Sequence, residues 1–231
     1  MRSFADLLET TAAAPATTDA RSLTTVAGVK LALKISGTDS DALIAALIPR
    51  VSALVVDHCR LARDGAGAVP TFGRETLRAT WYAESGACRG ADLYLPWRAP
   101  VYSLDSVVED GTTLTVGTDV VLPGAIGGRL RRLSGDAPAG WSGGKIVVTW
   151  KAGFALTTSL AANIDATIET AAIEQVKAML LGADRDPAIR SESAPDLAAV
   201  SYTVPGGDAQ GGAVLLPTVR DMLAPWRNPA P

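Results

Sequence analysis

The sequence predicts an α+β fold, in which a helical bundle is built around one long helix and a small antiparallel β-sheet is inserted. Three changes of pattern lead to this expectation. Residues 24–63 show the apolar spacing of helices, residues 74–154 break into short β-rich segments, and residues 163–182 return to helical spacing. An extended C-terminal tail completes the predicted architecture.

The long helix is expected within "DALIAALIPRVSALVVDHCRLAR", residues 41–63. Asp39 or Ser40 can cap its start, and Gly65 lies where a left-handed residue would end it. Pro49 lacks the N–H that a helix hydrogen bond needs, so we expect a kink at Pro49 or a break into two helices. The apolar residues share one broad face: Leu43, Ile44, Leu47, Val51, Leu54, Val55 and Cys59.

Two further helices are expected on either side of the β-rich region. A short one begins near Thr24, in "TTVAGVKLALKI". The other runs from about Asn163, a good N-cap, to about Leu181, with Gly182 as its stop. Its core face is predicted from residues at helical spacing: Ile164, Ile168, Ala171, Ala172, Val176 and Leu180.

The β-rich region consists of segments separated by Gly, Pro or Asp: "ETLRATWYA", "ADLYLP", "VYSLDSVVED", "TTLTV", "DVVLP", "GRLRRLS" and "KIVVTWKAGF". "EDGTT" predicts a hairpin with Asp110 and Gly111 at its tip. Ile146, Val148 and Trp150 alternate with more polar residues, as in a half-buried strand.

The ends of the chain differ from the predicted core at 23–182. Residues 1–22 are rich in Ala and Thr and predict an arm that orders only against something else. Residues 183–231 predict a linker, with one strand-like piece "AVSYTV", and a docking tail. Pro217 suits the first turn of a short helix in that tail.

Composition limits the function classes. The 231 residues carry a net charge of −3, so the chain as a whole is no basic nucleic-acid binder. Mean hydropathy is +0.20, which predicts a large core or a surface covered in an assembly. No apolar run reaches the ~18 residues of a membrane span, and the first 20 residues do not resemble a signal peptide. Two cysteines, Cys59 and Cys88, fit a reducing, intracellular origin, with a single disulfide between them as the alternative.

No catalytic, cofactor or metal site is predicted. Two cysteines and the single histidine, His58, do not make a four-ligand zinc site of the common kinds. His58 and Cys59 are adjacent on a helix and point about 100° apart, so they do not form a nucleophile–base pair. The carboxylates of Asp165 and Glu169 are best explained as the polar face of a helix.

Glycine-rich and basic segments also have structural explanations. "GWSGGKI", residues 140–146, lacks the first Gly of a phosphate loop and has Ile146 in place of a hydroxyl. A strand is expected after it, so we interpret it as a hairpin turn. Arg129, Arg131 and Arg132 could contact phosphate or protect an edge strand.

The order of the segments resembles the head–tail connector (adaptor) proteins of tailed bacteriophages, the gp6-like family, and the related gene-transfer-agent adaptors. The resemblance covers residues 24–227. It follows "TDSDALIAALIPRVSALVVDHC", "TLRATWY", "LYLPWRAPVYSLDSVVEDG", "VVTWKAGF" and the late "SYTVPGG" and "LLPTVRDMLAPWRNP". "DALI" at 41–44, "PV" at 100–101 and "AGF" at 152–154 match best.

The resemblance implies a structural virion protein of the neck, assembled in the host cytoplasm, and no enzyme. Family members form a ring, usually of twelve copies, that joins the portal to the tail, contacts a tail-completion or stopper protein and extends the DNA channel. DNA would pass through the lumen without specific binding, and no membrane is involved. Another neck or tail-completion protein, or a small enzyme with an unrecognised site, are the alternatives.

The C-terminal tail is the predicted interface with portal or a neighbouring subunit. "LLPTVRDMLAPWRNPAP", residues 215–231, carries an apolar stripe at helical spacing and an anchoring aromatic beside an arginine. The alternative is that the stripe folds back on the chain's own sheet. The predicted interface residues are Tyr202, Leu215, Leu216, Val219, Met222, Leu223, Trp226 and Arg227.

Overall fold

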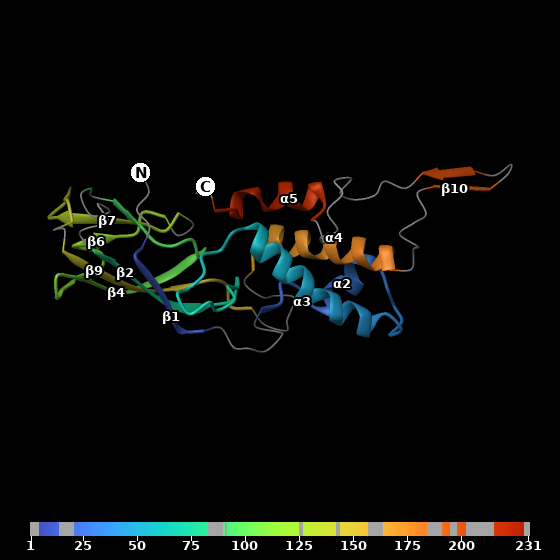
Figure 1. Cartoon of the computed structure of the whole chain (residues 1–231), viewed down its shortest axis with the longest axis horizontal. Helices are drawn as coiled ribbons and strands as arrows, with labels where there is room; N and C mark the ends of the chain where they lie inside the picture. The colour runs from blue at the N-terminus through green and yellow to red at the C-terminus, as the bar shows by residue number, and fades with distance from the viewer. Residues whose placement is uncertain are drawn as a thin grey trace.

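The helices and the larger sheets occupy opposite ends of an elongated molecule, and a two-stranded sheet lies beyond the helices (Figure 1). The computed structural model describes residues 5–13, 21–82, 90, 92–124, 127–141, 144–156, 164–183, 191–194, 198–201 and 215–228. Each end has its own hydrophobic core, one among the helices and one between the sheets.

A five-stranded antiparallel sheet forms the larger part of the β end. Its strand order is β1 (Leu7–Ala12), β2 (Glu75–Tyr82), β9 (Lys145–Ala152), β4 (Val101–Glu109) and β5 (Thr112–Leu114). Ile146, Val148 and Trp150 are all buried and alternate with half-buried neighbours, so the predicted half-buried strand is confirmed. The predicted hairpin joins β4 to β5, with Glu109 paired to Thr112. Its tip needs positive φ at both positions, and φ is 48° at Asp110 and 82° at Gly111.

A second antiparallel sheet contains β3 (Asp92–Tyr94), β7 (Arg129–Ser134) and β6 (Val120–Val121), and β8 (Ala137–Pro138) pairs with β7. The two sheets share one core. Trp81 and Trp150 from the first sheet belong to the same buried cluster as Leu93, Val120 and Leu130 from the second. The β end is therefore a folded unit with its own interior.

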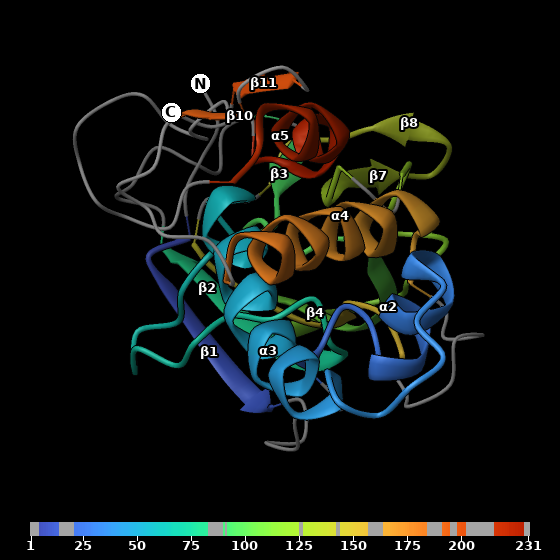
Figure 2. The same ribbon diagram turned by 90° about the vertical axis from the view of Figure 1, so that its right-hand side faces the viewer.

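The helical end packs α2 (Val26–Leu33), α3 (Asp41–His58), α4 (Ala166–Ala183) and α5 (Pro217–Leu223), which continues into the 3₁₀ turn η2 (Ala224–Trp226). Figure 2 looks along the molecule from this end and shows α4 between α3 and α5. The buried helical residues include Val29, Ile44, Val51, Val55, Ile168, Val176, Val219 and Leu223.

The predicted fold class is wrong in its proportions. The described chain is not a helical bundle around one long helix with a small inserted sheet. It is mostly β, with a five-stranded and a four-stranded antiparallel sheet and short helices. The reason is that the segments of the β-rich region form a separate core of their own, so they are a principal part of the fold.

Helix α3 also ends earlier than predicted, at His58. Arg60 takes the left-handed conformation expected of Gly65, with φ 53°, and its N–H donates to the carbonyl of Asp57. The expected break at Pro49 is absent, because α3 is continuous through that residue. Pro49 is exposed, and the buried side chains of Ile48 and Val51 hold the helix to the core on either side of it.

The other helix ends follow local hydrogen bonds. Thr25 Oγ1 caps α2 by accepting from the N–H of Gly28 at 3.0 Å. Asp165 Oδ1 accepts from the N–H of Thr167 ahead of α4, whereas the predicted cap Asn163 lies outside the described residues. Helix α4 runs one residue past Gly182, to Ala183.

Parts of both predicted terminal regions form strands. β1, from the predicted arm, is the edge strand beside β2. Its edge is partly covered, since the N–H of Gly65 donates to the carbonyl of Leu8 at 2.9 Å. In the predicted linker, β10 (Ser191–Ala194) pairs with β11 (Ala198–Ser201) in a two-stranded sheet.

Candidate functional site

The C-terminal segment, residues 215–228, lies along α4 and reaches the end of α3 (Figures 1 and 2). Pro217 occupies the first turn of α5, as predicted, where its missing N–H is no loss. One residue earlier, the N–H of Leu216 donates to Oε1 of the buried Gln175 on α4 at 2.9 Å. This bond fixes the start of the segment against the helical core.

The end of the segment is held by an aromatic cluster, which we define as Phe72, Phe154 and Trp226. The ring of Trp226 meets Phe154 at 5.7 Å and Phe72 at 6.5 Å between centroids, both edge-on. Nε1 of Trp97 donates to the carbonyl of Trp226 at 3.1 Å. The N–H of Asn228 donates to the carbonyl of Cys59 at 2.9 Å, which ties the segment to the end of α3.

The structure divides the predicted interface residues into two groups. Leu215, Val219, Leu223 and Trp226 are buried in the core of their own chain. Val219 and Leu223 belong to the helical core, and Trp226 packs on Phe72 and Phe154, which lie in no helix. Leu216 and Met222 are half-buried and Arg227 is exposed, so these three face outward at least in part. Tyr202 lies outside the described residues.

The outer surface beside this segment is basic. Arg220 and Arg227 are exposed on the segment, and Arg60 is exposed at the end of α3. Burial lowers the pKa of His58, and the charges of Arg227, Arg220 and Arg60 lower it further, against a smaller opposing effect of Asp57. The positive charges of all three guanidinium groups therefore disfavour protonation of the His58 imidazole.

His58 and Cys59 do not form a reactive pair. Cys59 is fully buried at the end of α3, and burial raises the pKa of its thiol to about 12, although the charge of Arg227 acts in the opposite direction. A thiol held neutral in this way is a poor nucleophile. Cys88 lies outside the described residues.

The sequence motifs that suggested phosphate binding are structural. Lys145 begins strand β9, so "GWSGGKI" precedes a strand and no helix N-terminus, although Ser142 and Gly143 lie outside the described residues. Nε of Arg131 donates to Asp92 at 2.8 Å, and Nη1 of Arg129 lies 3.7 Å from the same carboxylate. Nε of Arg132 donates to Glu109 at 3.0 Å. Each arginine of this cluster therefore has a carboxylate of its own chain beside it.

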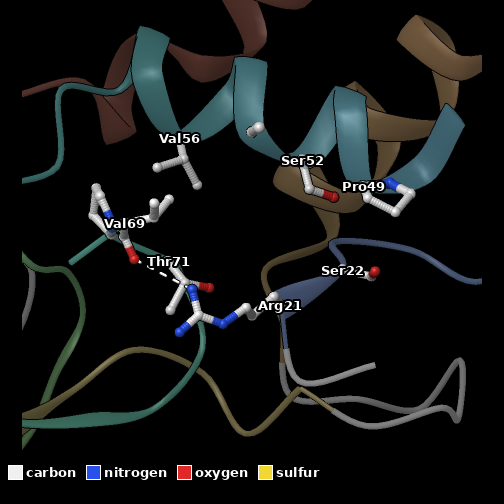
Figure 3. A pocket seen from close by; sticks show the side chains of 9 residues that line it. Arg21, Ser22, Pro49, Ser52, Val56, Val69 and Thr71 are labelled. Carbon is white, nitrogen blue, oxygen red and sulfur yellow. Dashed lines mark hydrogen bonds between the residues drawn. The ribbon is translucent and has the colours of Figure 1, made fainter. Parts of the chain in front are cut away.

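A cavity of about 280 Å³ beside α3 is the other candidate site (Figure 3). Its lining includes Arg21, Pro49, Ser52, Val69 and Thr71. Several of its polar groups already have partners: Nη1 of Arg21 donates to the carbonyl of Val69, Oγ of Ser52 donates to the carbonyl of Ile48, and Oγ1 of Thr71 accepts from Gly73. The cavity therefore offers no converging set of catalytic groups.

Across the part of the chain that the structure describes, no three His, Cys, Asp or Glu side chains come close enough to hold a metal ion. The described helices also include none with the length and apolarity to cross a membrane.

Sequence reasoning missed the residues that receive the C-terminal segment, namely Phe72, Phe154, Trp97 and Gln175. One signal was available in "AGF", residues 152–154. Gly153 has φ 93°, and a Cβ there would lie 2.2 Å from the carbonyl oxygen of Gly73. Only glycine permits this close approach, which delivers Phe154 to the helical core with its N–H donating to Phe72 at 2.7 Å.

Comparisons with known proteins identify one kind of structure. No protein-family model and no curated protein sequence matches the chain. Among solved structures, a chain of the neck of an empty GTA particle, computed with C6 symmetry, is 18% identical over 97% of both chains, with a TM-score of 0.51. A chain of the virion of a native gene transfer agent particle is 18% identical over 97% of this chain and 96% of that one, with a TM-score of 0.50. The chain thus has the fold of a gene-transfer-agent neck protein over nearly its whole length, as the resemblance in its sequence implied.

Proposed function

We propose that this chain is a structural subunit of the neck of a gene-transfer-agent or phage-like virion. The observation that carries the proposal is the end-to-end match to a neck protein, which spans 97% of both chains. A match of that extent includes the β end, the helical end and the C-terminal segment together. The two proteins therefore share a whole fold rather than one small module. The absence of converging reactive groups in the described residues agrees with a structural role.

The proposed assembly is a ring of twelve copies that joins portal to tail and extends the DNA channel. The C6 symmetry used for the first neck structure is compatible with a ring whose copy number is a multiple of six. A closed ring needs two different, complementary faces on each subunit. With a net charge of −3 per chain, DNA in the lumen would meet little general attraction.

The C-terminal segment is the proposed docking element toward portal or a neighbouring subunit. Its buried residues, Val219, Leu223 and Trp226, fix it to its own chain. The exposed Arg227 is available for contact, as are the uncovered parts of Leu216 and Met222, which also pack against the helical core. Docking through the outer side leaves the helical core intact.

A reconstruction of particles that carry a labelled copy of this chain tests the proposal. We expect density for the label in a ring between portal and tail, with a copy number that mass measurement of the isolated neck gives independently. Density at the tail tube or a tail-completion position would assign a different virion part, and a chain absent from particles would contradict the proposed function.

A second experiment tests the docking segment. Arg227→Glu combined with Thr218→Glu changes only exposed side chains of the segment, so we expect a folded chain that fails to join the neck. Asp136→Lys, an exposed change at the turn between β7 and β8, is the control and should assemble normally. Normal assembly of the double variant would exclude the outer side of the segment as the docking surface.

A further inference from the structure

Most cationic side chains in the described chain have a partner within the chain. Ion pairs hold Lys30, Arg63, Arg78, Arg98, Arg129, Arg131, Arg132, Lys151 and Lys177. Arg21 donates to a carbonyl, and Arg74 and Lys145 lie over the rings of Tyr102 and Tyr82. Within the described residues, the cations without any such partner are Lys34, Arg50, Arg60, Arg220 and Arg227.

Three of these unpartnered cations, Arg60, Arg220 and Arg227, gather at one place, which we call the arginine patch. The backbone of Asn228 donates to the carbonyl of Cys59, and its Nδ2 donates to the carbonyl of Arg60 at 3.4 Å. These bonds place Arg227 next to Arg60. Arg220 lies on α5 of the same segment, and the charges of all three arginines lower the pKa of His58 at the end of α3.

The three arginines of the patch outnumber the two carboxylates near them, Asp57 and Asp221. Asp57 lies nearby, but its carboxylate is 3.7 Å from Arg63 and both side chains are largely exposed. Asp221 is exposed on α5 next to Arg220. Most of the other described arginines have a partner within the chain, whereas these three are exposed to solvent, in a chain whose overall net charge is −3.

We propose that the arginine patch docks a carboxylate-rich surface of the adjoining neck protein. This inference rests on the proposed docking role of the C-terminal segment and names the chemistry of its partner. Guanidinium groups bind carboxylates with two parallel hydrogen bonds, so three of them can fix the orientation of an acidic partner as well as attract it. The half-buried Met222 and Leu216 add apolar contact beside the charges.

Acidic protein fits the patch better than nucleic acid. Asp57 and Asp221 lie among the arginines, and a continuous row of phosphates would be repelled by both. Carboxylates on a folded partner can be spaced to avoid them. Binding to DNA also grows with the number of cationic contacts, and the patch provides only a few.

Peptide binding by the full chain tests the chemistry directly. The probes are a hexaglutamate peptide, a hexaglutamine peptide and a short DNA duplex, measured at low and high salt. We expect hexaglutamate to bind in preference to the other two probes. The double variant Arg220→Ala/Arg227→Ala should weaken that binding about tenfold, since exposed charge pairs contribute modestly each.

The chain offers a matched control in Lys34→Ala/Arg50→Ala. This variant removes the same number of unpartnered, exposed cations outside the patch, and we expect it to bind hexaglutamate like the unchanged chain. Equal losses in the two double variants, no preference for hexaglutamate over hexaglutamine, or tighter binding of the DNA duplex through the same arginines would each overturn the proposal.

Assembly separates this inference from the proposed function. Particles made with Arg60→Glu/Arg220→Glu/Arg227→Glu should lack the neck, whereas particles made with Lys34→Glu/Arg50→Glu should retain it. Normal necks in the triple variant would overturn the arginine patch and leave the neck function standing. If the unchanged chain is itself absent from necks, the proposed function fails instead.

Discussion

Trp226→Ala tests whether the C-terminal segment is part of the core of its own chain. The indole is only 7% exposed and makes edge-on contacts with Phe72 and Phe154. Replacing a buried tryptophan with alanine destabilises proteins by about 3–5 kcal/mol, through lost burial and the cavity left behind. The hydrogen bond from the Trp97 indole Nε1 to the main-chain carbonyl of Trp226 does not involve the replaced side chain, so it survives the substitution. We therefore expect a loss of about 3–5 kcal/mol in the free energy of unfolding, a large part of the total for a typical domain.

The assay is urea unfolding of the isolated chain, followed by far-ultraviolet circular dichroism so that the lost tryptophan does not change the signal. Arg227→Ala, at the next residue, is the control. The Arg227 side chain is exposed, so its removal should change the free energy of unfolding by less than about 0.5 kcal/mol. A loss below about 1 kcal/mol for Trp226→Ala would refute the reasoning, since a core residue with these contacts cannot be removed so cheaply.

Three further predictions concern a glycine, the histidine and a buried carboxylate. Gly153→Ala should lower the free energy of unfolding in urea by about 2 kcal/mol or more, because its Cβ would lie 2.2 Å from the carbonyl oxygen of Gly73. Gly67→Ala is the control: with φ 78° and open space around it, it should show only the smaller backbone penalty. Equal losses in the two variants would contradict the steric explanation. Burial and the charges of three arginines lower the pKa of His58, the only histidine, so its NMR titration should give a pKa below 6.5. That pKa should rise in the triple variant Arg60→Ala/Arg220→Ala/Arg227→Ala. An unchanged pKa would show that the three arginines do not lie close to His58. Burial alone would raise the pKa of Asp64, but the polar groups of Thr10, the hydrogen bond from the N–H of Ala68 and the charge of Arg98 lower it. The stability that Asp64 adds is therefore present above its ordinary pKa of about 3.9 and lost as the pH falls through its lowered pKa in the folded chain. The unfolding free energies of the unchanged chain and Asp64→Asn should differ at pH 7 and converge in acid; a difference that does not change with pH would contradict this.

The sequence predicted local structure correctly where neighbouring residues determine it. The turn at Asp110 and Gly111, the alternation along β9 and the place of Pro217 depend on residues within a few positions of one another. The start of α3 was also predicted, whereas its end was not. The left-handed residue there is Arg60, which has no intrinsic preference for that conformation. Its carbonyl accepts from Asn228, far along the chain, so a distant contact accompanies the local turn.

The relative share of sheets and helices in the fold could not be predicted from the sequence, because it depends on which distant segments pack into one core. Trp81 and Trp150 come from one sheet and Leu130 from the other, and only the assembled sheets show that they enclose an interior. The same holds for the candidate site. The apolar stripe of the tail was recognised correctly as a stripe, but its partners Phe72 and Gln175 come from segments that carry no signal of the contact.

The burial of that stripe decides how the segment can dock at least cost. A partner that captured Val219, Leu223 and Trp226 would first have to lift them from the helical core, where each is at most 7% exposed. Burying one such side chain is worth about 1.5–3 kcal/mol, so uncovering the three would oppose docking by about 5–9 kcal/mol. Each 1.4 kcal/mol is a factor of ten in affinity. Unless new contacts offset the loss, such a partner would bind more weakly, by a factor of about a thousand or more, than one that leaves the three side chains buried. Docking through the outer side of the segment avoids that penalty, and the arginine patch and Met222 already face that way. The buried stripe then acts as the anchor that gives the outer surface a fixed shape, because a segment held rigidly before binding loses less entropy when its partner arrives.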